Sequence, residues 1–113
     1  MKLEIKEAHD EDVLIIGLIG SLDTNTAPEA ENVFNQWLEK DTKKMVVNLE
    51  ETKYISSAGL RVFLATTKKI TAAGGAVKFC SPNEVVKEIL DISGFTVILD
   101  VKATMEEALS SLK

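Results

Sequence analysis

The chain opens with two apolar-rich runs separated by a short polar segment. The runs cover residues 3–8 and 13–18, and the segment between them reads His9-Asp10-Glu11-Asp12. A four-residue polar loop between two such runs is typical of an antiparallel hairpin. We therefore expect two paired strands at this end of the chain, with His9 in a solvated turn.

Segments of helical and strand character alternate along the rest of the chain. Apolar residues recur at helical spacing in four segments and predict four helices. The expected inward faces are Ala30, Val33, Phe34, Trp37 and Leu38; Leu60, Phe63, Leu64, Thr67 and Ile70; Val85, Ile89 and Leu90; and Met105, Ala108, Leu109 and Leu112. Short apolar runs at 43–49, 76–80 and 95–99 predict three further strands. The order β-β-α-β-α-β-α-β-α predicts one α/β domain over residues 1–113, with helices packed on a mixed, mostly parallel sheet.

The predicted helices have recognisable start and stop signals. Three segments with the spacing of a capping box precede apolar helical faces. They are Thr26-Ala27-Pro28-Glu29, Ser81-Pro82-Asn83-Glu84 and Thr104-Met105-Glu106-Glu107. Glycines at 74, 75 and 94 stand where two helices are expected to end.

Two adjacent serines stand at the start of the second predicted helix. Residues 54–63 read Tyr-Ile-Ser-Ser-Ala-Gly-Leu-Arg-Val-Phe, after a buried strand and a polar turn at 50–53. A helix start favours an anion, because its first N–H groups are free and the positive end of the helix dipole lies there. A hydroxyl of Ser56 or Ser57 is therefore either a helix cap or an acceptor for a phosphate.

Asp23 lies in the loop after the second predicted strand. Loops that follow parallel strands emerge at one edge of a sheet, so this loop and the serine pair are expected to share an exposed rim. Two roles for Asp23 stay open. It is either a turn residue bonded to its own backbone or part of a binding surface.

Composition narrows the function classes. The chain has 113 residues, a net charge of −5 and one cysteine, Cys80, and no apolar run long enough to span a bilayer. These features predict a small, acidic cytoplasmic protein without a disulfide, and they disfavour nucleic acid and anionic membranes as partners. One histidine and one cysteine cannot close a zinc site. We therefore expect no metal, and we also expect no cofactor. We expect no enzymatic activity either, because nothing places His9 beside a serine as a base.

The serine segment resembles the signature of the anti-sigma factor antagonists, which belong to the STAS domain family. Other parts of the chain agree with this resemblance, which extends over essentially the whole sequence. They are the Gly20-x-Leu22-Asp23 turn, the strand at 46–49, the Gly74-Gly75 turn, the Ser81-Pro82 helix start, and the segments 92–95 and 106–109.

The resemblance implies a partner switch. An unphosphorylated antagonist captures an anti-sigma factor that is also a serine-protein kinase of the histidine-kinase-like ATPase fold. Phosphorylation ends the capture, and a metal-dependent serine phosphatase restores it. The acceptor matches Ser57, two residues before Gly59, while Ser56 replaces the family's usual aspartate and is a second candidate. The implied partner-binding residues are Asp23, Thr24, Asn25, Ser56, Ser57, Ala58, Gly59 and Arg61. The alternative is a scaffold or small-ligand-binding module that phosphorylation does not regulate.

Overall fold

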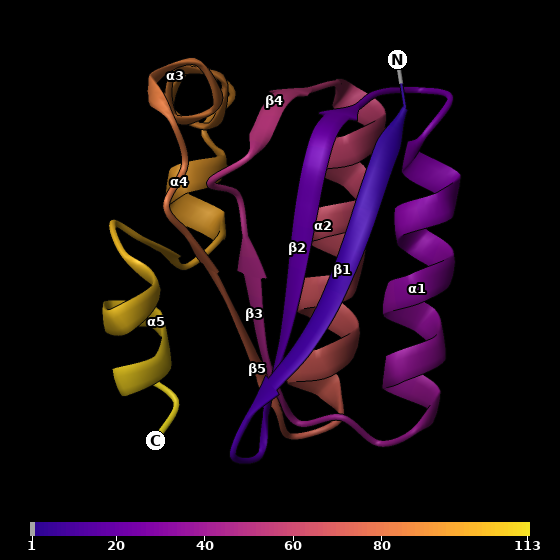
Figure 1. The fold of residues 1–113 in the computed structure, drawn as a ribbon, viewed down its shortest axis with the longest axis vertical. Helices are drawn as coiled ribbons and strands as arrows, with labels where there is room; N and C mark the ends of the chain where they lie inside the picture. The colour runs from indigo at the N-terminus through magenta and orange to yellow at the C-terminus, as the bar shows by residue number, and fades with distance from the viewer. Residues whose placement is uncertain (1) are drawn as a thin grey trace.

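A computed structural model describes residues 2–113 of the chain. These residues form six strands and five helices, arranged as Figure 1 shows. The elements are β1 (Leu3–Asp10), β2 (Val13–Leu22), α1 (Ala27–Glu39), β3 (Lys44–Asn48), β4 (Thr52–Ile55), α2 (Ser57–Ala72), β5 (Ala76–Cys80), α3 (Glu84–Ile92), α4 (Phe95–Ile98), β6 (Val101–Lys102) and α5 (Met105–Ser110).

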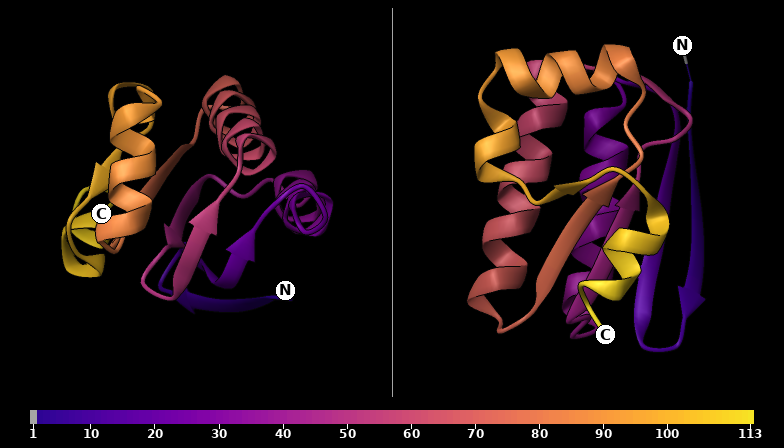
Figure 2. Two further views of the ribbon diagram at one scale, coloured as in Figure 1. Left: turned by 90° about the horizontal axis from the view of Figure 1, so that it is seen from above. Right: turned by 90° about the vertical axis from the view of Figure 1, so that its left-hand side faces the viewer.

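The strands form one mixed sheet in the order β1-β2-β3-β5-β6, and β4 pairs with β2. The β1–β2 pair is antiparallel, and the other pairs are parallel. Helices α1 and α2 cover one face of the sheet, while α5 packs on the other face (Figures 1 and 2). This arrangement confirms the predicted α/β class with a mixed, mostly parallel sheet.

Alternation along the strands divides the interior into two cores. The larger core lies between the sheet and helices α1 and α2, where Phe34, Phe63 and Phe79 are fully buried. The ring centroid of Phe63 lies 6.5 Å from that of Phe34 and 4.7 Å from that of Phe79. The smaller core lies under α5 and consists of Val13, Val46, Cys80, Ala108 and Leu112. Burial raises the pKa of the Cys80 thiol.

Strand β4 corrects the prediction of a polar turn over residues 50–53. β2 has ten residues, and β3 pairs only with its first half, so the second half of β2 is open to another strand. β4 fills this place, with Thr52 opposite Gly20 and Ile55 opposite Leu22. The buried Thr52 hydroxyl also donates to the Leu18 carbonyl at 2.6 Å. Lys53 and Tyr54 are exposed, and for this reason the segment has no apolar strand signature.

The segment predicted as a last strand at 95–99 is also different. Gly94 has a φ of 79°, which reverses the chain after α3 and starts the short helix α4. The backbone N–H of Leu99 donates to the Phe95 carbonyl at 2.7 Å and closes that helical turn. The last strand, β6, comes later and has only two residues.

Two of the three predicted capping boxes are wrong. The Thr26 hydroxyl donates to the Ser21 carbonyl at 2.8 Å and makes no cap bond, although Thr26 is the N-cap residue of α1. Ser81 adopts a φ of 59°, and Asn83 caps α3 by accepting the Val86 N–H at 2.9 Å.

The predicted Thr104 cap of α5 is confirmed by its bond to the Glu107 N–H. The later start of α3 also changes its inward face. Val86 is buried there, whereas Val85, which the apolar spacing predicts to face inward, is exposed.

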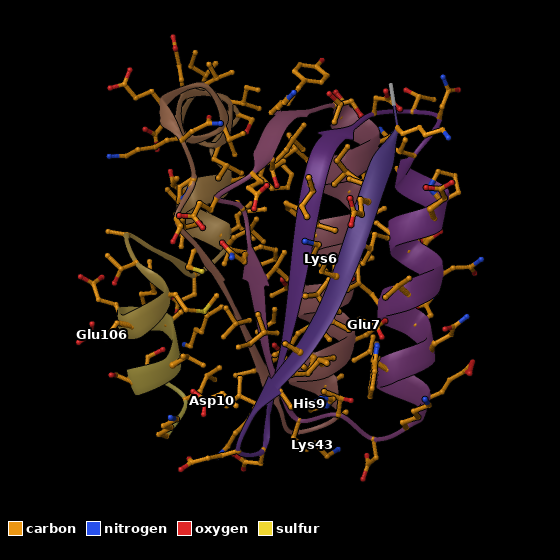
Figure 3. The ribbon with its side chains drawn as sticks, in the orientation of Figure 1. Lys6, Glu7, His9, Asp10, Lys43 and Glu106 are labelled. Atoms are coloured by element: carbon orange, nitrogen blue, oxygen red, sulfur yellow. The ribbon has the colours of Figure 1, made fainter. Side chains whose placement is uncertain are left out.

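The N-terminal hairpin is confirmed, but its strands are longer than predicted. Its turn has only two residues, Glu11 and Asp12. His9 is therefore a strand residue and not a turn residue. Its ring lies 5.3 Å from that of Trp37 in an edge-on arrangement, and the Trp37 indole donates to Glu7 at 2.9 Å (Figure 3 labels His9 and Glu7).

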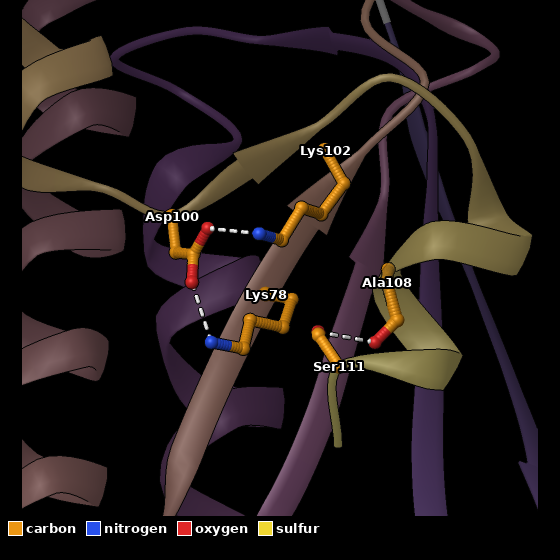
Figure 4. Close-up of polar contacts among 5 residues, drawn as sticks. All are labelled: Lys78, Asp100, Lys102, Ala108 and Ser111. Carbon is orange, nitrogen blue, oxygen red and sulfur yellow. Dashed lines mark hydrogen bonds and ion pairs between the residues drawn. The ribbon is translucent and has the colours of Figure 1, made fainter. Parts of the chain in front are cut away.

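An ion-pair cluster joins the last two strands. Asp100 accepts hydrogen bonds from Lys78 on β5 and from Lys102 on β6, the latter at 3.2 Å (Figure 4). The two ammonium groups, Lys78 above all, lower the pKa of the Asp100 carboxyl. In α5 nearby, the Ser111 hydroxyl donates to the Ala108 carbonyl at 2.8 Å.

Candidate functional site

Strand pairing brings the serine segment and the Asp23 loop together. The backbone N–H of Ser56 donates to the Leu22 carbonyl at 2.8 Å, directly after the Leu22–Ile55 register pair. Ser56 thus lies beside the residue that precedes Asp23. The structure therefore places the two predicted loops at one edge of the sheet, where β4 leads into α2 (Figure 1).

The two serines have different roles in the fold. Ser56 is the N-cap of α2, and its side-chain oxygen accepts the Gly59 N–H at 3.3 Å. Ser57 is the first helical residue and is exposed. Within residues 2–113, no group forms a hydrogen bond with its hydroxyl. The cap interpretation therefore applies to Ser56, and the hydroxyl of Ser57 is left accessible.

Gly59 is required by packing inside the domain. The residue is buried, and a Cβ atom placed on it would lie 2.8 Å from Cδ2 of Leu22 and 3.0 Å from Cγ2 of Ile55. A side chain here would push the first turn of α2 away from β2 and β4. The absence of a side chain at position 59 therefore serves the packing of α2 against β2 and β4. Ala58 is half-buried and packs against the larger core.

Asp23 organises its own loop. Its Oδ1 atom accepts the N–H groups of Asn25 at 2.9 Å and Thr26 at 3.0 Å, and its own N–H donates to the Thr26 hydroxyl. The bonds that the carboxylate accepts, above all the bond from the Thr26 N–H, lower the pKa of the Asp23 carboxyl. The predicted turn role is therefore present. Asp23 as a residue is half-buried, while Thr24 and Asn25 are exposed beside it.

Arg61 completes the set of predicted site residues. It lies four residues after Ser57 in α2, so the two side chains share one face of the helix. Arg61 is exposed and forms no ion pair with any other residue of the described chain. A positive charge thus stands one helical turn from the Ser57 hydroxyl.

Within residues 2–113, nothing at this edge of the sheet indicates nucleophilic catalysis or metal binding. His9 lies near the β1–β2 turn, at the far end of the sheet from the start of α2 (Figures 1 and 3). Ser57 therefore has no imidazole within reach to act as a base. Among residues 2–113, no group of three His, Cys, Asp or Glu side chains is arranged to hold a metal ion. No helix in the same range is long and apolar enough to cross a bilayer.

A separate hollow of about 830 Å³ lies at the carboxyl ends of β3 and β5. Its walls come from the β3–β4 turn, the β5–α3 connection and the first turns of α5, with Asn48, Ser81 and Met105 among the lining residues. Neither Ser57 nor Asp23 lines it. The hollow is thus distinct from the serine site.

Comparison of the chain with known proteins identifies its family. The profile of the STAS domain matches residues 4–108. An anti-sigma F factor antagonist of Paenibacillus polymyxa is 30% identical over 114 aligned positions, which cover 100% of this chain and 97% of the relative. The sequence similarity therefore extends over the whole domain.

Two solved structures of SpoIIAA, a Bacillus anti-sigma factor antagonist, share the fold. The unphosphorylated form has a TM-score of 0.79 at 19% identity, with 97% of this chain and 95% of that chain covered. The phosphorylated form has a TM-score of 0.73 at 18% identity, with coverage of 99% and 100%. Since the family profile spans most of the chain and the 30% identical relative aligns over its full length, the chain belongs to the STAS-domain family of anti-sigma factor antagonists.

Proposed function

We propose that this protein is an anti-sigma factor antagonist that works by partner switching in the cytoplasm. Its unphosphorylated form binds an anti-sigma factor that is also a serine kinase of the histidine-kinase-like ATPase fold. Phosphorylation of Ser57 ends this binding, and a metal-dependent serine phosphatase reverses it. The observation that carries the proposal is the exposed, unbonded hydroxyl of Ser57 at the first residue of α2, beside the Asp23 loop.

The position of Ser57 accounts for both halves of the switch. A phosphate adds about −1.5 to −2 charges at neutral pH. The helix start accommodates these charges, because its dipole favours an anion by about 0.3–1 kcal/mol. An interface packed over Ser57 does not, because an unpaired charge buried there costs several kcal/mol. Phosphorylation therefore opposes the complex without disturbing the fold.

The partner surface of this proposal surrounds Ser57. It contains Ser56, Ala58 and Arg61 on the α2 side and the 23–25 loop on the β2 side. Gly59 is left out because it is buried. Ser56 is a weaker acceptor candidate than Ser57, since its oxygen already caps the helix and a phosphate there would compete with that bond.

Affinity capture from native lysate tests the proposal. The baits are the Ser57→Ala and Ser57→Asp variants, with Ser110→Ala and Ser110→Asp as the matched pair, because Ser110 is an exposed serine on α5. We expect a serine kinase on the Ser57→Ala bait and its loss from the Ser57→Asp bait. Both Ser110 baits should retain it. Equal recovery on the two Ser57 baits would remove Ser57 as the switch.

The 830 Å³ hollow supports a second candidate, a small-ligand-binding module without phosphorylation. Intact mass measurement of the protein purified from its native host separates the two functions. A mass increment of one phosphate, absent from the Ser57→Ala variant, supports the switch. An unmodified protein under all growth conditions supports the ligand module.

A further inference from the structure

Helix α3 carries an unusual amount of exposed apolar surface. Val85 is 55% exposed and Ile92 is 79% exposed, although Val86 and Leu90 already anchor the helix to the core. Val85 and Ile92 stand seven residues apart, with the half-buried Ile89 between them at the fourth position. Residues at i, i+4 and i+7 lie along one side of a helix. We call Val85, Ile89 and Ile92 the apolar stripe.

An acidic row runs beside this stripe. Glu84, Glu88 and Asp91 repeat the same i, i+4, i+7 spacing one residue earlier, and all three are exposed. None of them forms an ion pair with another residue of the described chain. The helix therefore presents a line of apolar side chains bordered by a line of exposed carboxylates.

The stripe lies on the side of α3 that is turned away from Lys87. Lys87 and Asp91 line a hollow whose other walls come from α4 and β6, which marks one side of the helix. At about 100° per residue, Val85 and Ile92 lie roughly 140–160° around the helix from Lys87. Helix α3 lies at the same end of the molecule as the start of α2 (Figure 2).

Contacts tie α3 to the segment that carries the serines. The Asn83 side chain, at the start of α3, donates to the Thr52 carbonyl on β4 at 2.9 Å. Tyr54, on the same strand, is 47% exposed and precedes Ser56 by two residues. Strand β4 thus joins α3 to the serine segment, and Tyr54 adds exposed apolar surface on that strand.

A partner that covers Ser57 needs this surface. A stable interface buries about 800 Å² on each protein and has an apolar centre. The residues around Ser57 are small or polar, so they supply no large apolar anchor. Resting on the function proposed above, we propose that the apolar stripe and its acidic row are the specificity surface for the anti-sigma factor kinase. The partner's matching face is apolar with a basic border, because it must pair with Glu84, Glu88 and Asp91.

Calorimetric titration of each variant with the purified kinase, identified by the Ser57→Ala bait, measures the binding affinity and tests this surface. We expect Ile92→Ser and the Val85→Ser/Ile92→Ser pair to weaken binding at least tenfold. Glu88→Lys should weaken binding and reduce its dependence on salt. The control is Val97→Ser, because Val97 is 89% exposed on α4 outside the stripe and its loss should change affinity less than twofold. Circular dichroism and unfolding midpoints should match wild type in every variant.

The outcomes separate this inference from the proposed function. If the Val85→Ser/Ile92→Ser pair binds like wild type while Ser57→Asp does not, the switch stands and the stripe is not its docking surface. If the Ser57→Ala bait recovers no kinase, the proposed function fails and the inference falls with it. If the stripe variants lose binding while Val97→Ser keeps it, the α3 surface is the specificity determinant.

Discussion

The backbone N–H of Ser56 donates a 2.8 Å hydrogen bond to the carbonyl oxygen of Leu22. This single bond fixes the start of α2 against the end of β2. It follows from the parallel pairing of β4 with β2, in which Ile55 stands opposite Leu22. The exposed hydroxyl of Ser57 and the Asp23 loop are neighbours because of this pairing. The geometry makes four predictions.

Replacement of Gly59 by alanine should destabilise the fold. The new Cβ atom would lie 2.8 Å from Leu22, so α2 or the Leu22 side chain must shift. We expect a loss of about 1–3 kcal/mol, as for other overpacked cores. Urea unfolding of Gly59→Ala measures this loss. Gly17→Ala is the matched control, because its Cβ would lie 3.9 Å from that of Lys6. We expect this variant to lose no stability and to gain up to about 1 kcal/mol from the lower entropy of its unfolded chain. An unchanged midpoint for Gly59→Ala would show that Leu22 moves aside without cost.

Replacement of Ser56 and of Ser57 by alanine should change the stability of the fold by different amounts. Ser56→Ala removes the side-chain oxygen that accepts the Gly59 N–H, so we expect a loss of about 0.5–2 kcal/mol. Ser57→Ala removes an exposed hydroxyl without a partner and should stay within about 0.5 kcal/mol of wild type. Chemical denaturation of both variants under one condition gives the comparison. Equal losses would contradict the assignment of Ser56 as the sole cap.

A negative charge at Ser57 should stabilise the isolated domain. Ser57→Asp places the charge at the start of α2, where the dipole contributes about 0.3–1 kcal/mol. Arg61 follows at i+4 and adds about 0.2–0.5 kcal/mol. Thermal unfolding of Ser57→Asp, with and without Arg61→Gln, measures both contributions. Ser110→Asp places a negative charge at the end of α5, where the dipole disfavours it, and should lower the melting temperature. If Ser57→Asp lowers the melting temperature, release of the partner involves the fold as well as the interface.

Removal of the Asp23 carboxylate should destabilise the fold less at acidic pH than at neutral pH. The pKa of Asp23 in the folded chain lies below its ordinary value of 3.8, chiefly because of the Thr26 N–H. A carboxyl with a depressed folded pKa stabilises the fold above its unfolded pKa, and this contribution is lost as the pH falls through the folded value. The stability difference between wild type and Asp23→Ala should therefore shrink as the pH falls from about 5 through the folded pKa. Unfolding curves across this range measure it, and Thr24→Ala, beside Asp23 in the loop, should show a pH-independent difference.

Much of the site followed from local sequence signals. The apolar spacing from Leu60 onward and the strand and polar turn before Tyr54 indicated a helix start at the serine pair, and α2 begins at Ser57. Sequence could not assign the cap to one of the two serines. That choice depends on backbone angles, since Ser56 adopts an extended conformation and its oxygen turns back to Gly59. The sequence did not predict the exposed stripe on α3 for a related reason, which is the choice of cap residue. Asn83 instead of Ser81 starts the helix, so Val86 instead of Val85 faces inward.

The sequence by itself determined the α/β class, the N-terminal hairpin, the four main helices and the place of the serine pair. Periodicity and helix stop signals act over a few residues, so they can be recognised without knowledge of distant parts of the chain. The tertiary structure decided that residues 52–55 form a strand, that residues 95–98 form a helical turn, and that Gly59 is buried. The strand at 52–55 depends on the open half of β2 and the burial of Gly59 on the side chain of Leu22, both distant in sequence. The turn at 95–98 depends on the left-handed backbone of Gly94, which apolar periodicity does not reveal.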